Sequence, residues 1–257
     1  MLLGVLALAA TTVMAQKPRR EKKPQVVPQR FIVGVHSGID IGGAVPWPPG
    51  KIGGQSKMKA VPHLTPALGL SWTTIYTQQW SASLEATYKT VSLDATAWVT
   101  DQMFKDVESG LIKHFRGTTD ITMGFSMIEV PLYLRYTFRD GNNRVMLGGY
   151  YSYVIKGKFR ANPLKGTLTS DPSSNDPNDY DPVAPGDQVE QDFSDYLSKW
   201  DAGVILGYER ALFPRVTLSG RFMMGFKDIF RRDSKYLDYK MLHMRGTLVL
   251  SYQFMRK

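Results

Sequence analysis

The fold is decided by the stretch LHMRGTLVLSYQF, which occupies residues 242–254 near the C-terminus. Every second residue from Leu242 to Phe254 is apolar or glycine, and most of the residues between them are polar. A period of two places alternate side chains on opposite faces of an extended chain. The stretch therefore predicts a β-strand that has one apolar face and one largely polar face.

The same alternation recurs in seven further stretches upstream. The fourth strand changes phase, because its apolar residues are odd-numbered up to Met127 and even-numbered from Ile128. We expect a β-bulge near Ser126 to Ile128, which would also accommodate Pro131. The seven stretches cover residues 31–41, 64–76, 80–88, 121–138, 145–155, 200–208 and 216–226.

The connections between these stretches alternate between long and short. An antiparallel barrel in an outer membrane has short periplasmic turns and long extracellular loops. We therefore predict an all-β fold, an eight-stranded antiparallel transmembrane up-and-down β-barrel over residues 31–257, located in the outer membrane with periplasmic termini. The long connections are residues 44–61, 94–119, 160–198 and 231–240, and the short ones are residues 77–79, 139–144 and 212–215.

Alternation also fits a soluble barrel of the lipocalin type. In such a barrel the polar face meets water and is rich in Lys and Glu, whereas here it is mostly Ser, Thr and Gly, as in a narrow interior. Aromatic residues of the apolar face fall near strand ends and predict two belts at the membrane surfaces. The belts comprise Trp72, Tyr76, Trp80, Tyr136, Phe138 and Phe254 near the short turns, and Trp200, Phe159 and Phe230 near the long loops.

Scattered charges of both signs lie on the polar face and would point into the lumen. An interior of eight strands is just wide enough to be filled by side chains, so we do not expect a general solute pore. Isolated charges in such a place are costly, so ion pairs and hydrogen bonds are expected across the barrel. The candidate lumen network is Asp40, Glu85, Lys89, Glu129, Arg135, Asp201, Glu209, Arg221, Lys227 and Arg245, with Lys156 as a further lumen candidate.

The N-terminal residues predict export. Residues 1–15 form a short apolar run that ends in Val13-Met14-Ala15, which is typical of a signal peptide rather than a membrane anchor. Residues 16–30 form a basic, Pro-rich periplasmic leader without an apolar period, interpreted as a spacer or as a contact for lipid phosphates or a partner. The chain contains no cysteine, which excludes disulfides and thiolate metal sites.

Residues 160–198 are acidic, although the whole chain has a net charge of +9. Long loops on a rigid scaffold often carry function, so this loop is a candidate partner site. Calcium binding is the alternative, but the loop lacks the Gly and terminal Glu of an EF-hand. The candidate partner residues are Asp171, Asp176, Asp179, Tyr180 and Asp181.

No convincing catalytic group emerges from the sequence. His36 and His243 could pair near Asp40 as metal ligands or as a base, but no third ligand stands at a suitable spacing. Membership of a polar lumen network is the favoured role for both. We therefore predict no enzyme activity, no catalytic or metal residues and no cofactor.

Two strands carry a resemblance to a known family. Residues 128–136, IEVPLYLRY, resemble a strand of the Bacteroidota outer-membrane β-barrel superfamily, which includes PorT-type proteins, and residues 201–209, DAGVILGYE, are similar to its sixth strand. The resemblance covers about residues 31–254. It specifies fold and lineage more than function.

PorT-type members are implicated in type IX protein secretion. The resemblance therefore implies a non-enzymatic interaction or assembly component, a secretion accessory rather than the conduit. Its partners would be outer-membrane lipids and other envelope or secretion-machinery proteins, and not nucleic acid. A small membrane-embedded enzyme and a narrow channel remain the alternatives.

Overall fold

The computed structural model describes residues 30–47, 58–105, 112–184, 191–231 and 240–256. The expected signal peptide (residues 1–15) and nearly all of the expected leader (residues 16–30) lie outside the described residues. Within the described ranges, no helix is long and apolar enough to cross a membrane.

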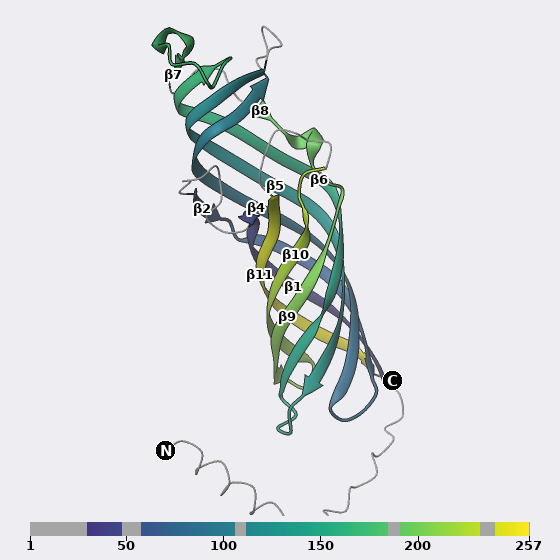
Figure 1. The fold of residues 1–257 in the computed structure, drawn as a ribbon. Coiled ribbons are helices and arrows are strands. Elements are labelled where there is room, and N and C mark those ends of the chain that lie inside the picture. The colour runs from purple at the N-terminus through teal and green to yellow at the C-terminus, as the bar shows by residue number, and fades with distance from the viewer. Residues whose placement is uncertain (1–29, 48–57, 106–111, 185–190, 232–239, 257) are drawn as a thin grey trace, which may run out of the picture.

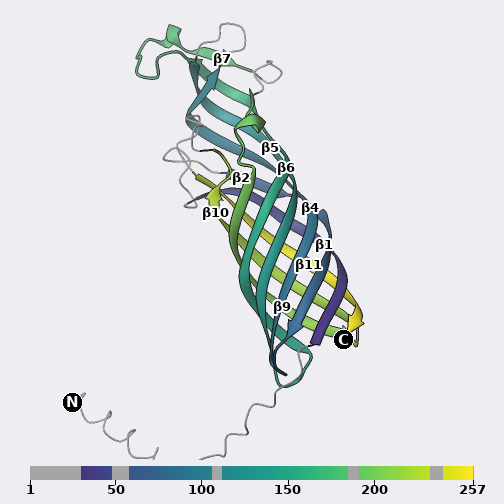
Figure 2. The same cartoon turned by 90° about the vertical axis from the view of Figure 1, so that its right-hand side faces the viewer.

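Eight antiparallel strands form a closed ring in the described part of the chain, as predicted. Each strand pairs with the next in chain order, and β1 pairs with β11 to close the ring (Figures 1 and 2). The ring consists of β1 (Arg30–Trp47), β3 (Thr65–Ile75), β4 (Trp80–Lys105), β5 (Ile112–Thr137), β6 (Asn143–Thr169), β9 (Trp200–Phe213), β10 (Val216–Asp228) and β11 (Lys240–Arg256).

Short elements add to two strands of the ring. The strand β2 (Met58–Pro62) pairs with β4, while β7 (Asp181–Val183) and β8 (Gln191–Asp192) both pair with β6. Two single-turn 3-10 helices, η1 (Pro177–Asp179) and η2 (Ser194–Tyr196), lie in the connection from β6 to β9.

The outside of the ring is apolar, which distinguishes a membrane barrel from a soluble barrel of the lipocalin type. Large side chains such as Leu68, Leu132, Leu147 and Leu206 are more than half exposed, while polar side chains of the same strands, such as Glu129 on β5 and Glu209 on β9, are buried. A soluble protein rarely exposes a continuous apolar surface of this kind. The barrel is therefore built to be surrounded by lipid.

The three short turns lie at the end of the barrel that carries the C-terminus (Figures 1 and 2). The turn between β5 and β6 shows why so few residues suffice. Gly141 adopts a φ of 74°, which favours glycine, and the Asp140 carboxylate accepts hydrogen bonds from the backbone N–H groups of Asn142 and Asn143, both at 3.2 Å.

The described part of the predicted loop at 94–119 is largely strand, and β6 extends into the predicted loop at 160–198, which corrects the sequence prediction. β4 continues to Lys105, β5 begins at Ile112 and β6 continues to Thr169. These three strands project well beyond the rest of the barrel, at the end opposite the C-terminus (Figures 1 and 2). The prediction stopped too early because it followed apolar residues on the outer face.

A register shift lies between Ser126 and Met127, as expected, but the extra residue is on the neighbouring strand. Ser126 pairs with Lys156 and Met127 with Val154, so Ile155 of β6 is the additional residue. β5 itself keeps its odd-numbered residues inward throughout. The change of phase in its sequence therefore marks a change in the chemistry of its faces and not a bulge within β5.

The aromatic belts follow the prediction in part. Trp72 and Trp80 are exposed near the short turns, and Trp200 is exposed at the other end. Phe159 and Phe230, also predicted for the belt, are instead buried, because the bulge at Ile155 turns the far part of β6 round and Phe230 lies beyond the end of β10. The second belt comprises Tyr88, Tyr151, Tyr153, Trp200 and Phe226.

Candidate functional site

The lumen nearest the short turns is filled by buried ion pairs. Glu129 is at the centre of one cluster, where the Lys89 ammonium lies 2.8 Å and the Arg245 guanidinium 2.7 Å from its carboxylate. The Ser152 hydroxyl donates a further hydrogen bond to Glu129 at 3.0 Å. Lys89 also donates to Asp40 at 2.7 Å, so five strands are joined across the interior.

A second cluster surrounds Glu85. Arg221 binds its carboxylate with two N–H groups, at 2.5 and 2.9 Å, and the Tyr133 hydroxyl donates to the same carboxylate. Arg135 donates to the Tyr133 oxygen at 2.8 Å and lies 3.3 Å from Glu209. Both guanidinium groups also lie over the Tyr133 ring, about 5 Å from its centroid.

The structure places nine of the ten candidate lumen residues in the interior. Asp201 is among them and accepts a hydrogen bond from the Tyr150 hydroxyl at 2.7 Å. Lys227 is the exception, because its ammonium lies 3.4 Å from the ring centroid of the outward-facing Trp200. Lys156 also lies outside the lumen and is exposed, because it follows the bulge.

Arg144 belongs to the lumen network but was not predicted. It pairs with Glu209 at 2.5 Å. Arg144 is even-numbered, like the inward residues of β6, so the alternation of the strand predicts an inward side chain. The sequence prediction placed Arg144 in the adjoining turn instead. With Arg144 included, the described interior holds five carboxylates (Asp40, Glu85, Glu129, Asp201, Glu209) and five cations (Lys89, Arg135, Arg144, Arg221, Arg245).

The two lumen histidines do not form a pair. His36 shares a hydrogen bond of 2.9 Å with the Thr87 hydroxyl, whereas His243 packs edge-on against Phe125 at a centroid distance of 4.9 Å. In the register of β1 and β11, His36 is opposite Ser251 and His243 is opposite Ala44. Among the described residues, no three His, Cys, Asp or Glu side chains come together as metal ligands.

Beyond the ion network the interior becomes apolar. Among the described side chains of β4, Lys89 is followed on the inward face by Val91, Leu93 and Ala95, and the face stays apolar as far as Val99. An apolar cluster fills this part and closes the lumen above the ions. Its members are Ala44, Val91, Leu93, Ala95, Ala97, Ile121, Met123, Phe125, Met127, Val154, Phe159, Ala161, Phe193, Leu197, Ile229, Phe230 and Met241.

At the same level along the barrel, the outer face changes from apolar to polar. On β4 it changes from Leu84 and Tyr88 to Thr90, Ser92 and Asp94. An apolar inner face and a polar outer face are what a sheet needs in water. The lipid boundary therefore lies near Tyr88. We refer to residues 90–105 of β4, 112–126 of β5 and 156–169 of β6 as the distal sheet.

The candidate partner loop is held at the tip of the distal sheet by its own carboxylates. Asp171 accepts hydrogen bonds from the Ser173 hydroxyl (2.6 Å) and backbone N–H (2.9 Å), which lower the pKa of Asp171 below its usual value. Asp176 caps η1 by accepting from the Asn178 N–H at 2.9 Å. The Tyr180 hydroxyl donates to the Ser174 carbonyl at 2.8 Å. The loop is thus ordered by local turns.

The other two candidate partner residues, Asp179 and Asp181, each contact a polar or charged side chain. Asp179 accepts a hydrogen bond from the Ser174 hydroxyl, and the Asp181 carboxylate lies 3.5 Å from the Lys113 ammonium on β5. Tyr180 also lines a cavity of about 300 Å³. Its other lining residues are Thr100, His114, Phe115, Arg116, Thr167, Thr169 and Pro172.

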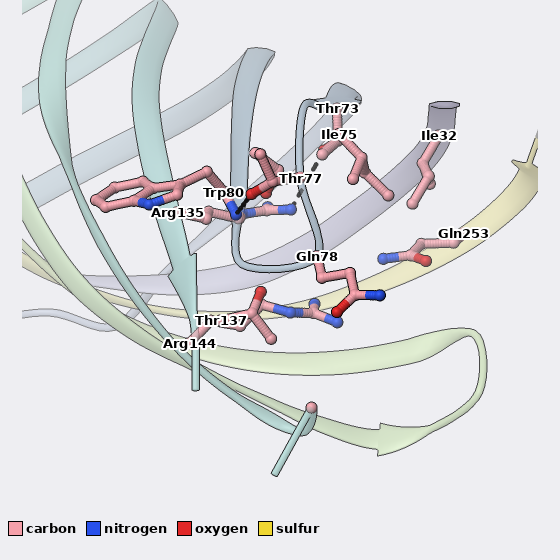
Figure 3. A pocket seen from close by; sticks show the side chains of 12 residues that line it. Ile32, Thr73, Ile75, Thr77, Gln78, Trp80, Arg135, Thr137, Arg144 and Gln253 are labelled. Atoms are coloured by element: carbon pink, nitrogen blue, oxygen red, sulfur yellow. Dashed lines mark hydrogen bonds between the residues drawn. The ribbon is translucent and has the colours of Figure 1, made fainter. Parts of the chain in front are cut away.

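A second cavity, of about 310 Å³, opens at the end with the short turns (Figure 3). Arg135 and Arg144 line it, and Arg135 donates to the Thr73 hydroxyl at 3.2 Å. Both arginines also bind Glu209, so the ion network forms the inner wall of this cavity. The cavity therefore lies between the short turns and the ion network.

The ring, its apolar exterior and its polar interior define a transmembrane β-barrel. Residues 14–231 match the family described as Outer membrane protein beta-barrel domain, and the chain belongs to this family. The protein is therefore an outer-membrane protein. No curated protein matches the chain.

Among solved structures, several outer-membrane barrels are similar to the chain. Ail, the attachment invasion locus protein of Yersinia pestis, solved in complex with the heparin analogue sucrose octasulfate, has 11% identity and a TM-score of 0.39 over 87% of this chain and 99% of that chain. OprG from Pseudomonas aeruginosa has 14% identity and a TM-score of 0.36 over 90% and 98%. The translocator domain of autotransporter NalP from Neisseria meningitidis has 11% identity and a TM-score of 0.21 over 90% of each chain.

Proposed function

We propose that the chain is a non-enzymatic interaction or assembly component of the outer membrane, and that partner proteins dock on the distal sheet. The observation that carries the proposal is that β4, β5 and β6 continue past the lipid boundary with a buried apolar inner face, where Val99, Phe115 and Leu168 pack together with Val183 of β7. Anchoring a barrel requires only the residues that cross the lipid. A rigid sheet beyond the membrane is more than anchoring needs.

The tip of the distal sheet suits recognition. Asp171 and Asp176 hold their own turns, so the loop is presented in one shape and loses little conformational freedom on binding. Tyr180 adds an aromatic ring at a cavity, and such rings are enriched where proteins bind one another. A partner with a basic segment would complement the exposed carboxylates.

The interior counts against a narrow channel as the main role. Glu129 and Glu85 are each bound by buried cations, and the apolar cluster lies above them. Ions would have to break these contacts to pass. We also predict that the barrel carries no catalytic activity of its own.

The resemblance of residues 128–136 to PorT-type barrels supports a more particular role. We propose that the partners include subunits of a type IX protein secretion system and that the chain is an accessory to that machinery. The basic leader that precedes β1 is a second contact in this proposal, on the periplasmic side.

The test is affinity capture of the chain from gently solubilised native outer membranes, followed by mass spectrometry. The matched variant removes the tip by two deletions, each closed with a two-residue turn. One joins Ala97 to Thr119, its partner across β4 and β5, and the other joins Ala161 to Gln191, its partner across β6 and β8, which removes the candidate partner loop. Because every residue within the lipid is kept, this variant should insert normally, which its heat-dependent migration on a gel would verify.

Partners that accompany the full chain in fixed amounts, but not the shortened one, would support docking on the distal sheet. Secretion-machinery subunits among them would support the type IX role. A barrel recovered alone, or with the same partners for both variants, would overturn the proposed docking surface.

A further inference from the structure

Four lysines gather on one side of the barrel at the lipid boundary. Lys156 and Lys158 point outward from β6 just past the bulge, and Lys199 precedes β9. The Lys199 carbonyl accepts a hydrogen bond from the Val154 N–H at 2.8 Å, which brings it beside Lys156. Lys227 of β10 completes the group, which we name the lysine collar.

Aromatic rings form a floor under the lysine collar. Tyr151 and Trp200 stack with a centroid distance of 6.1 Å and an interplanar angle of 20°, and Tyr153 is opposite Trp200 in the register of β6 and β9. The Lys227 ammonium lies 3.4 Å from the Trp200 ring centroid. Rings of this kind sit at the level of lipid headgroups. The ammonium groups of the collar are therefore at or just above that level.

The rest of the boundary has different chemistry. On β4 the corresponding outward residues are Thr90, Ser92 and Asp94, and Asp94 is engaged by His63 at 2.8 Å. Near the collar, the Asp192 carboxylate binds Arg160 at 3.1 Å. Asp201 points into the lumen and binds Tyr150. Asp228, which follows Lys227, accepts hydrogen bonds from the backbone N–H groups of Phe230 and Met241, and Asp195 on η2 is exposed. The four lysines along β6, β9 and β10 form a local concentration of positive charge beside these carboxylates.

We propose that the lysine collar binds the phosphate groups of a phosphorylated lipid in the surrounding leaflet. An ammonium is a compact point charge that binds phosphate well. The flexible stem of each lysine can lie along the aromatic floor while its head reaches the phosphate. Clusters of basic residues at a membrane surface attract anionic headgroups. This lipid site is separate from the partner surface proposed above.

The test uses the whole barrel in phosphatidylcholine nanodiscs that contain lipid A. One set carries lipid A with both phosphates, and the other carries the same lipid after enzymatic removal of its phosphates. Native mass spectrometry then counts the lipid A molecules retained on the protein. We expect the wild-type protein to retain the phosphorylated form preferentially, and that preference to weaken as salt is raised.

The matched variants are Lys156→Gln with Lys158→Gln against Lys59→Gln with Lys165→Gln, four exposed lysines of which the second two lie on β2 and near the far end of β6. Both pairs remove the same charge. The collar pair should reduce retention of phosphorylated lipid A by roughly tenfold or more, and the control pair should not.

Equal retention of the two lipid forms by the wild-type protein would overturn the proposal without any variant. Equal losses in the two lysine pairs would overturn it as well, because they would indicate a general charge effect. Displacement of the lipid by millimolar inorganic phosphate would show that the site holds free phosphate rather than a lipid headgroup.

Discussion

Within the membrane, β4 points Glu85 into the barrel and Leu84 out, whereas further along the same strand Leu93 points in and Asp94 points out. The backbone hardly differs between the two regions, because the register of β4 with β5 is unbroken from Trp80 to Val99. Alternation thus identifies a strand wherever it occurs. Whether the apolar side chains point out of the barrel or into it tells whether lipid or water lies outside.

The largest expected effect comes from removing a carboxylate from the membrane half. Glu129→Leu leaves Lys89 and Arg245 buried without their shared partner, and it should lower the free energy of unfolding by about 5 kcal/mol. Urea unfolding in lipid vesicles measures this. The contrasting variant is Asp120→Leu, an outward carboxylate on the distal half of β5, which should cost no more than about 1 kcal/mol. Similar losses for both would contradict the comparison.

Removing an aromatic ring from the distal core should act locally. The Phe159 ring packs against Phe193 and Phe230, with centroids 6.0 and 4.9 Å away. Phe159→Ala should destabilise the distal sheet by about 3–4 kcal/mol. Hydrogen exchange of its backbone amides reports this. Tyr151→Ala, on the lipid-facing part of the same strand, is the control and should leave those amides unchanged.

Two substitutions on the outer face of β5 compare an arginine that meets lipid with one that meets water. Leu132→Arg places a charge against the lipid near mid-membrane and should cost about 2–4 kcal/mol. Thr122→Arg, ten residues earlier on the same strand and face, should cost less than about 0.5 kcal/mol because its side chain meets water. Unfolding in vesicles of the two variants measures the difference. Equal costs would mean that the lipid boundary is misplaced.

The smallest expected effect concerns pH at the tip. The lowered pKa of Asp171 means that its charged form stabilises the turn to Ser173 above the ordinary aspartate pKa of about 4, and that this contribution is lost as the pH falls through the lower, folded-state pKa. Acidification should therefore lower the hydrogen-exchange protection factor of the Ser173 amide, relative to the intrinsic rate at each pH, while amides of the membrane half keep theirs. In the Asp171→Asn variant this loss of protection on acidification should vanish, and if it persists, another group is responsible.

Much of the fold could be predicted from the sequence, because alternation assigns each residue to a face without knowledge of the neighbouring strand. Glu85, Glu129 and Arg245 could be placed inside for that reason. Much of the distal sheet was missed because its apolar residues point inward and its polar residues outward, the reverse of the membrane half. The run from Val91 to Val99 nevertheless stays in phase with Lys89, and it is the signal that would have extended β4.

The errors at individual residues have a common cause. A change of phase in the sequence of one strand can mark a bulge or a change in the chemistry of its two faces, and the sequence of β5 alone does not distinguish them. Locating the bulge on β5 rather than at Ile155 of β6 left Lys156 in the lumen and Phe159 in the aromatic belt. Lys227 was misplaced near a second register shift, between Met224 and Asp228. The ion pairs themselves depend on residues far apart in the chain, which no local pattern reports.

The unbroken pairing of β4 with β5 has a consequence for how such proteins diverge. Inserting two residues into each strand between the lipid boundary and the tip would preserve every side chain's face and lengthen each strand by about 7 Å. Inserting one residue would turn the inner face outward. The height of the distal sheet above the membrane can therefore change during evolution in steps of two residues per strand, while the membrane-spanning half keeps its sequence.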